Sequence, residues 1–138
     1  MLEKLALRYV ERFATTRSRL TAYLNRKIHE RGFAGEAPET AALAERLAQA
    51  GYIDDRAFGE ARARTMARRG LGARRVAIAF RQAGIDDEDS AALEPEIADR
   101  AIHAAIAFAR RRRIGPFGTG KPDRQVLERQ IAAMIRGG

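Results

Sequence analysis

The 138-residue chain contains no cysteine and only three valines, three lysines and two serines. The lack of cysteine excludes a disulfide framework, a thiolate metal site and a thiol nucleophile, and it is compatible with a reducing compartment. No apolar run approaches the roughly 18 residues that a membrane-spanning helix needs. The first residues also lack the charged region and long apolar stretch of a secretory signal. We therefore expect a soluble, cytoplasmic protein that does not bind membranes.

Large apolar side chains are scarce as well. Of the 63 residues in the hydrophobic class, 28 are alanine, which leaves 35 larger side chains for a core. The length allows one domain or a few small repeats of one unit. Short stacked helices, with alanine where two helices approach closely, would suit so thin a core.

Positive charge is the main excess in the composition. The chain has 26 Lys+Arg against 18 Asp+Glu, a formal net charge of +8. Because 23 of the 26 basic residues are arginine, bidentate contacts with phosphates or carboxylates are available. Codon bias in a GC-rich genome is the simpler explanation of the preference for arginine over lysine. The net charge itself favours a polyanionic partner, either nucleic acid or an acidic protein surface.

The apolar spacing is helical almost throughout the chain. Strand-like alternation occurs nowhere for more than a few residues, so we predict an all-α fold. Leu2, Leu5, Tyr9 and Phe13 share a face of the first predicted helix. The predicted helices cover residues 2–13, 16–32, 38–51, 54–70, 72–83, a short segment capped by Asp86, a long segment from Pro95 to Arg113, and a last segment capped by Asp123.

One helical pattern recurs along the chain. Residues 24–33 and 76–85 each combine an arginine-rich helix, an apolar i, i+4 pair, a glycine stop and an apolar residue after it. The stops, Gly32 and Gly84, are 52 residues apart, and the last helix ends at Gly138, 54 residues further on. Stacked copies of such a unit would bury the apolar face that one copy cannot bury alone. Chance resemblance between short amphipathic helices is the alternative.

Charge is segregated along the chain. Residues 62–81 contain seven basic side chains and no acid, residues 86–99 contain seven acids and no base, and four arginines follow at 110–113. A single charge run is usually a solvated face, but a third basic cluster at 17–31 and the net charge favour a polyanion-binding surface. The candidate contact residues are Arg17, Arg19, Arg26, Arg68, Arg69, Arg74, Arg75, Arg110, Arg111, Arg112 and Arg113.

No motif predicts catalysis or a cofactor. Residues 115–121 have the spacing of a phosphate-binding loop, but a proline stands inside the loop and Pro122 replaces the required hydroxyl residue, so a linker is the better interpretation. The acidic run 87–89 lacks the glycine and the distal glutamate of a calcium loop. His29 and His103 each stand alone. We expect no catalytic residue, no metal ligand and no cofactor.

Three segments carry a family resemblance. They are Gly-Tyr-Ile-Asp-Asp-Arg-Ala-Phe at 51–58, Arg-Arg-Gly-Leu-Gly at 68–72 and Phe-Arg-Gln-Ala-Gly-Ile-Asp at 80–86. Together they resemble the central signature of the RecX family, the bacterial regulators of the RecA recombinase. The stretch 6–33 resembles the first unit of that family, and the resemblance covers roughly residues 5–113 well and the tail loosely.

The resemblance implies an elongated array of three tandem three-helix repeats, distantly like helix-turn-helix units. We place them at residues 1–51, 52–93 and 94–138, with Asp54 capping the fourth helix and Tyr52, Ile53 and Phe58 joining neighbouring repeats. By analogy with the first two units, a further helix would follow Gly138. Without it, Leu127, Ile131 and Ile135 are expected to be partly uncovered.

The resemblance also implies a function. A RecX-like protein would bind in the groove of the RecA–single-stranded DNA filament as a monomer and lower its recombinase, ATPase and co-protease activities, with effects on DNA repair and the SOS response. The partners would be the RecA filament and single-stranded DNA, with non-specific binding to duplex DNA as a further option.

Two alternatives remain open from the residues alone. One is a helix-turn-helix nucleic-acid-binding protein or transcriptional regulator, which would need a recognition helix and usually a dimer. The other is a scaffold whose basic surface meets an acidic protein.

Overall fold

The computed structural model describes residues 2–32 and 39–138, and every element in these ranges is helical, which confirms the predicted all-α fold. The α-helices are α1 (Leu2–Arg12), α2 (Arg17–Arg31), α3 (Thr40–Gln49), α4 (Asp55–Arg68), α5 (Ala73–Ala83), α6 (Asp87–Asp99), α7 (Ala101–Arg112) and α8 (Arg124–Gly137), with a 3₁₀ turn, η1 (Gly115–Phe117), between the last two.

Four helices begin where short-range capping rules predict. Each capping side chain accepts a hydrogen bond from the backbone N–H three residues later, which satisfies one of the unpaired donors at the helix start. The caps are Thr16, Asp54, Asp86 and Asp123. The predicted start of the third helix at Pro38 lies outside the described residues.

Two hydrophobic cores organise the first six helices. The first core joins α1, α2 and α3, and the second joins α4, α5 and α6. Alanine contributes to both, as expected where short helices approach closely. The first core consists of Ala6, Leu20, Leu24, Leu43, Ala44, Leu47 and Ile53. The second consists of Ala63, Met66, Val76, Phe80, Ala83, Ile85 and Leu93.

Helix α4 buries a different face from the one that apolar spacing predicts. The spacing places Phe58, Ala61 and Thr65 inward. The structure instead buries Gly59, Ala63 and Met66. The reason is a close approach at Gly59, where an added Cβ would lie 2.8 Å from the side chain of Leu93 in α6. Packing across α4 and α6 therefore selects the glycine face, and the predicted face stays open.

The predicted helix start at Pro95 is wrong. Pro95 lies inside α6, and the chain bends at Arg100, between α6 and α7. Leu93 is buried and Ile97 packs against the second core, so one helical face spans the proline. That packing outweighs the cost of proline in a helix interior, about 3 kcal/mol.

Helices α7 and α8 pack against each other, and α7 also packs against α4. Apolar spacing predicts that Ile97, Ala101, Ala105 and Phe108 share the inward face of the segment 95–113. Phe108 is buried as predicted, but Ala104 is buried in place of Ala101 and Ala105, which are exposed. Helix α8 leaves an apolar line uncovered. Leu127, Ile131 and Ile135 are 46%, 52% and 59% exposed.

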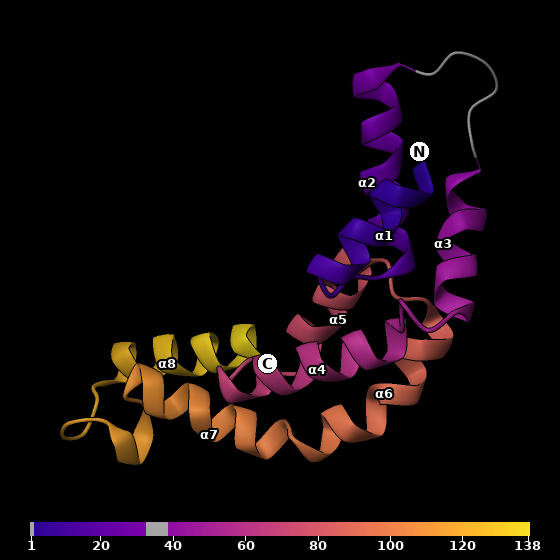
Figure 1. Cartoon of the computed structure of the whole chain (residues 1–138). Coiled ribbons are helices and arrows are strands. Elements are labelled where there is room, and N and C mark those ends of the chain that lie inside the picture. The colour runs from indigo at the N-terminus through magenta and orange to yellow at the C-terminus, as the bar shows by residue number, and fades with distance from the viewer. Residues whose placement is uncertain (1, 33–38) are drawn as a thin grey trace.

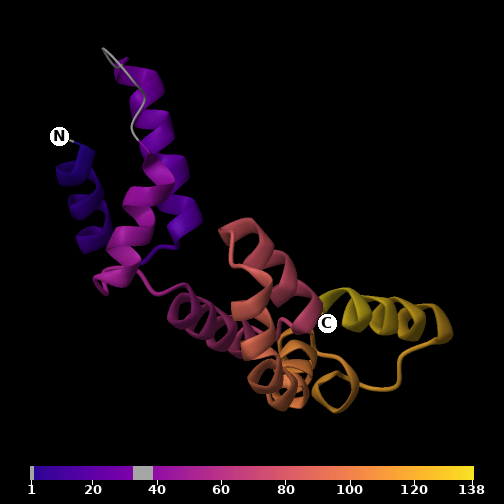
Figure 2. The ribbon, with the colours of Figure 1, turned by 90° about the vertical axis from the view of Figure 1, so that its right-hand side faces the viewer.

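The helices form an elongated, bent body. Figures 1 and 2 show α1–α3 together at one end, α4–α6 in the middle and α8, packed on α7, at the other end. The division of the chain into three repeats stays a proposal. Its second boundary, between 93 and 94, falls inside α6, and we place it at the bend at Arg100 instead. Within the described residues, no helix has the length and apolarity needed to cross a membrane.

Candidate nucleic-acid interface

Arg17 is the one predicted contact arginine that is partly buried, and its side chain is already engaged. It is the first residue of α2, and its guanidinium meets Glu45 at 2.7 Å, Asp55 at 3.3 Å and Asp86 at 3.3 Å. Its backbone N–H also donates to Asp55 Oδ1 at 2.9 Å. The hydrogen bonds to Glu45 and then to Asp55 raise the pKa of the Arg17 guanidinium above its ordinary value.

This network joins the two cores. Glu45 belongs to α3, Asp55 begins α4 and Asp86 caps α6, so one side chain links the starts of α2, α4 and α6. Asp55 is almost fully buried, its side chain being 4% exposed. A buried carboxylate needs charged or hydrogen-bonding partners, and Arg17 supplies them. The arrangement therefore gives Arg17 a structural role at the junction.

A second contact holds the same junction together. The Thr16 hydroxyl, which is fully buried, donates to the Ala83 carbonyl at the end of α5. The next residue, Gly84, has φ +74°, and a Cβ added there would collide with the Ser18 side chain of α2. Glycine at this position therefore allows the start of α2 to approach the end of α5.

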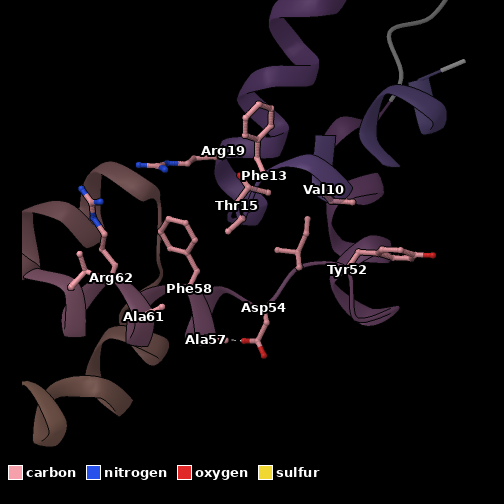
Figure 3. Close-up of a pocket in the computed structure, with 13 residues that line it drawn as sticks. Val10, Phe13, Thr15, Arg19, Tyr52, Asp54, Ala57, Phe58, Ala61 and Arg62 are labelled. Carbon is pink, nitrogen blue, oxygen red and sulfur yellow. Dashed lines mark hydrogen bonds between the residues drawn. The ribbon is translucent and has the colours of Figure 1, made fainter. Parts of the chain in front are cut away.

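An open groove of about 520 Å³ lies beside this junction, and we call it the junction groove. Its walls are mainly apolar, and Figure 3 shows its side chains coming from the end of α1, the 13–15 connection, α2, the link before α4, and α4 itself. The α4 wall is the line that spacing had placed in the core. The lining residues are Val10, Phe13, Ala14, Thr15, Arg19, Tyr52, Ile53, Asp54, Ala57, Phe58, Ala61, Arg62 and Thr65.

The three residues expected to join neighbouring repeats behave differently. Ile53 is buried in the first core, and Phe58 packs against the second core from the edge of the groove. Tyr52 is 52% exposed and belongs to neither core, so its role in joining repeats stays a prediction. Phe13 lies beyond the end of α1 and is 49% exposed, so it does not share the buried face of that helix. The groove thus carries one ring at the edge of the second core, Phe58, and two largely exposed rings, Tyr52 and Phe13.

Arginines accompany these rings. The Arg19 guanidinium carbon lies 5.3 Å from the centroid of Phe58, and that of Arg12 lies 5.3 Å from the centroid of Phe13. Arg26 lies on the exposed surface of α2, two helical turns beyond Arg19 and near the same face. Cation–π contacts leave the guanidinium edge free to donate hydrogen bonds to a phosphate.

A second group of predicted arginines surrounds the turn between α4 and α5. Arg68 and Arg69 end α4, Arg74 and Arg75 lie in the first turn of α5, and all four are exposed. The turn is tight because Gly70 has φ +81° and lies against the backbone of Phe108 in α7.

The C-terminal residues pack on the same turn. The backbone N–H groups of Gly72 and Arg74 donate to the carbonyls of Gly137 and Gly138, each at 2.8 Å. The Arg75 side chain donates to the Arg136 carbonyl at 3.0 Å. These bonds satisfy unpaired donors at the start of α5 and leave the Arg74 side chain on the surface.

The arginines of the third cluster lie at the end of α7. Arg110 packs over Phe117 with its guanidinium carbon 5.1 Å from the ring centroid, and Arg112 packs over Phe108 at 5.5 Å. Arg113 caps the helix in the left-handed region at φ 55°, and Arg111 is exposed beside it. Phe108 also lies against Gly70, so this residue of α7 packs between Arg112 and the α4–α5 turn.

The acidic residues of segment 86–99 form few ion pairs with the arginines of the chain. Asp86 pairs with Arg17, and Asp89 pairs with Arg56 at 3.0 Å. Among the described residues, none of these acids pairs with the arginines of 62–81. The basic surface around the α4–α5 turn is therefore not neutralised from within the described part of the molecule.

The remaining candidates for chemistry have simple structural surroundings. His29 and His103 are both exposed, and within the described ranges no cluster of His, Cys, Asp and Glu could hold a metal ion. Residues 115–121 follow a helix instead of a strand, so the geometry of a phosphate-binding loop is not present there.

Sequence reasoning missed two arginines and the groove beside them. Arg12 and Arg62 are not among the predicted contact residues, yet they lie with Arg19 around Phe13 and Phe58. The glycine within α4 is the sequence signal that could have revealed the groove. Once Gly59 is taken as the point of helix contact, the line of Phe58, Ala61 and Thr65 lies at the edge of the second core and is partly open.

Comparisons with known proteins agree with this architecture. A family profile described as "RecX, second three-helix domain" matches residues 54–92, which contain α4, α5 and part of α6. "Regulatory protein RecX" from Myxococcus xanthus is 32% identical over 150 residues, an alignment that covers 99% of this chain and 78% of the relative.

Two further relatives carry the same name. The protein from Halorhodospira halophila is 33% identical and aligns with 96% of this chain and 77% of its own length. The protein from Mycolicibacterium smegmatis is 31% identical, with 92% and 69% covered. No solved structure gives a significant match. From the similarity over nearly its full length and from the matched three-helix unit, the chain belongs to the RecX family of regulatory proteins.

Proposed function

We propose that this protein regulates RecA by binding the RecA–single-stranded DNA filament and lowering its recombinase, ATPase and co-protease activities, and so affects DNA repair and the SOS response. The observation that carries the proposal is the family membership over 99% of the chain. The fold supports it, because an elongated body can lie along a filament groove and contact it at several separated points.

The charge distribution supports the same partner. Ten of the eleven predicted arginines are exposed, and they lie at three places along the body: α2, the α4–α5 turn and the end of α7. Guanidinium groups so placed can contact phosphates or the acidic side chains of a protein filament. Arg17 is excluded from this surface, because its guanidinium is engaged by three carboxylates.

The division into three-helix repeats fits this mode of binding. Stacked units with a short internal contact at each junction give a long, shallow surface instead of one deep site. We propose that α1–α3, α4–α6 and the segment from α7 onward are the three units, each presenting its own arginines.

The test is ATP hydrolysis by RecA, stimulated by single-stranded DNA, with increasing amounts of this protein. We expect inhibition that is strong at protein concentrations stoichiometric with RecA. Absence of inhibition at that ratio, with the protein folded by circular dichroism, contradicts the proposal. Tight binding to one duplex sequence over others would instead indicate a helix-turn-helix regulator.

A further inference from the structure

The junction groove is an apolar concavity that neither core fills. One wall is the α4 face carrying Phe58, Ala61 and Thr65, and Phe13 lies opposite it. Figure 3 shows Arg19 and Arg62 extending toward one end of the groove and Tyr52 toward the other. A volume of about 520 Å³ lies within the range of small-ligand clefts, about 300–1,000 Å³, and is large enough for a nucleobase.

The rim of the groove is positively charged. Among the described residues, the guanidinium groups of Arg19 and Arg62, which line the groove, have no carboxylate within 4.0 Å. Asp54 is the acid that lines the groove, and its carboxylate is occupied by the N–H of Ala57 at 3.0 Å. An anionic ligand with a flat apolar surface matches this combination.

We propose that the junction groove binds single-stranded nucleic acid, with unpaired bases stacking on Phe13 and Phe58 and with phosphates contacting Arg19 and Arg62. The inference rests on the proposed function for the choice of a single strand as ligand, and it adds a direct base contact remote from the arginines of the α4–α5 turn. Proteins that bind single strands combine a positive groove with aromatic platforms in this way.

The contacts in the groove and beside it suit stacking. Arg19 already lies over Phe58 and Arg12 over Phe13. Because a guanidinium plane stacks with a base much as an aromatic ring does, each arginine extends the platform of its ring. An acidic peptide with one apolar side chain could use the positive charge and the apolar wall of the groove. It would gain little from the planar aromatic rings and guanidinium groups.

Figure 3 also shows different places for base stacking and for phosphate contact. The Phe58 ring faces the interior of the groove and the Phe13 ring lies across from α4 and points away from it, whereas the guanidinium ends of Arg19 and Arg62 lie at one edge. Bases would therefore enter the groove while the backbone of the strand stays at the rim. Such binding reads no sequence, because every base presents a flat face.

The experiment measures fluorescence anisotropy of two labelled strands with RecA absent. One is an oligothymidylate, and the other is an abasic phosphodeoxyribose chain of the same length. The wild-type protein is expected to bind the oligothymidylate at least about 5-fold more tightly, the smallest effect usual for one stacked base. Equal affinity for the two strands overturns the proposal.

Substitutions test whether the preference for the oligothymidylate depends on the groove. Phe13→Ala, and Phe58→Leu, which keeps much of the packing on the second core, should each remove most of the preference for the oligothymidylate. Ile102→Ala, at a side chain 72% exposed on α7 and away from the groove, is the matched control and should keep that preference. Arg62→Gln should weaken the binding of both strands by a similar factor, since phosphates are common to both.

Three outcomes overturn the proposal besides equal wild-type affinity. The first is a folded Phe13→Ala protein that keeps the full preference. The second is an equal loss of preference in the Ile102→Ala control. The third is a Phe13→Ala protein that binds oligothymidylate normally but no longer binds a glutamate-rich, leucine-containing peptide, which would make the groove a peptide site. Because RecA is absent, these outcomes are independent of the ATPase test.

Discussion

Among individual residues, Arg17 shows most clearly what short-range rules can and cannot predict. The four helix caps follow from residue types within three positions of the helix start, and all four are predicted correctly. The partners of Arg17 lie 28, 38 and 69 residues away along the chain. No local pattern separates this arginine from its exposed neighbours, so it is predicted as a contact residue although its side chain joins the two cores.

Replacement of Arg17 should destabilise the fold. Arg17→Ala removes the guanidinium from Asp55, whose side chain is 4% exposed, and leaves a buried carboxylate without its cation. We expect a loss of about 2 kcal/mol in the free energy of unfolding, since a stranded buried charge is costly even where its partner is partly hydrated. Urea denaturation followed by circular dichroism measures this loss.

The matched control is Arg56→Ala, which removes a more exposed ion pair with Asp89. That variant should lose less than about 1 kcal/mol, as exposed pairs usually do. Equal stability of the Arg17→Ala protein and the wild type would show that the network does not hold the junction.

Among the helices, the predictions fail where packing between distant elements overrides local pattern. Proline within α6 is tolerated because Leu93 and Ile97 hold one face of that helix on the second core. Spacing alone also misplaces the inward face of α4, because Gly59 has no side chain to mark it as the contact point. The number of helices, by contrast, follows from the apolar period and the glycine stops.

Gly84, which ends α5, should be sensitive to any side chain. Gly84→Ala combines a φ of +74° with a collision against Ser18 of α2. The left-handed backbone costs about 1–2 kcal/mol for a non-glycine residue. The collision adds about 1 kcal/mol or more, as overpacking does elsewhere. Thermal and urea unfolding measure the sum.

Gly51→Ala isolates the backbone part of that cost. Gly51 has a similar φ, +87°, and nothing lies within 4 Å of an added Cβ. The Gly84 variant should therefore be the less stable of the two. Equal destabilisation of both variants would mean that α2 and α5 do not approach as closely as the structure shows.

Across the molecule, the excess positive charge is distributed along an elongated body. The charge runs and their order were evident from the sequence, and so was the tandem character of the helices. The packing of α7 on the α4–α5 turn was not evident from the sequence. Helix α7 reaches the α4–α5 turn because Gly70 lies against Phe108, and the C-terminal residues pack on the same turn.

Arg74, at this turn, should contribute to binding without supporting the fold. The Arg74 side chain is exposed, and its backbone N–H makes the bond to Gly138, so Arg74→Ala leaves that bond in place. We expect weaker filament binding and a salt slope that is smaller by about one, with unchanged unfolding. Arg124→Ala, at the start of α8 with a side chain 93% exposed, is the control and should bind like the wild type.

The central claim is that the protein recognises the RecA–single-stranded DNA filament and not polyanions in general. Its affinity for that filament can be compared by anisotropy with its affinity for duplex DNA of equal length at the same salt concentration. We predict at least about tenfold tighter binding to the filament, persisting at a salt concentration that releases the duplex. Equal affinity for filament and duplex, falling in parallel with salt, would contradict the claim.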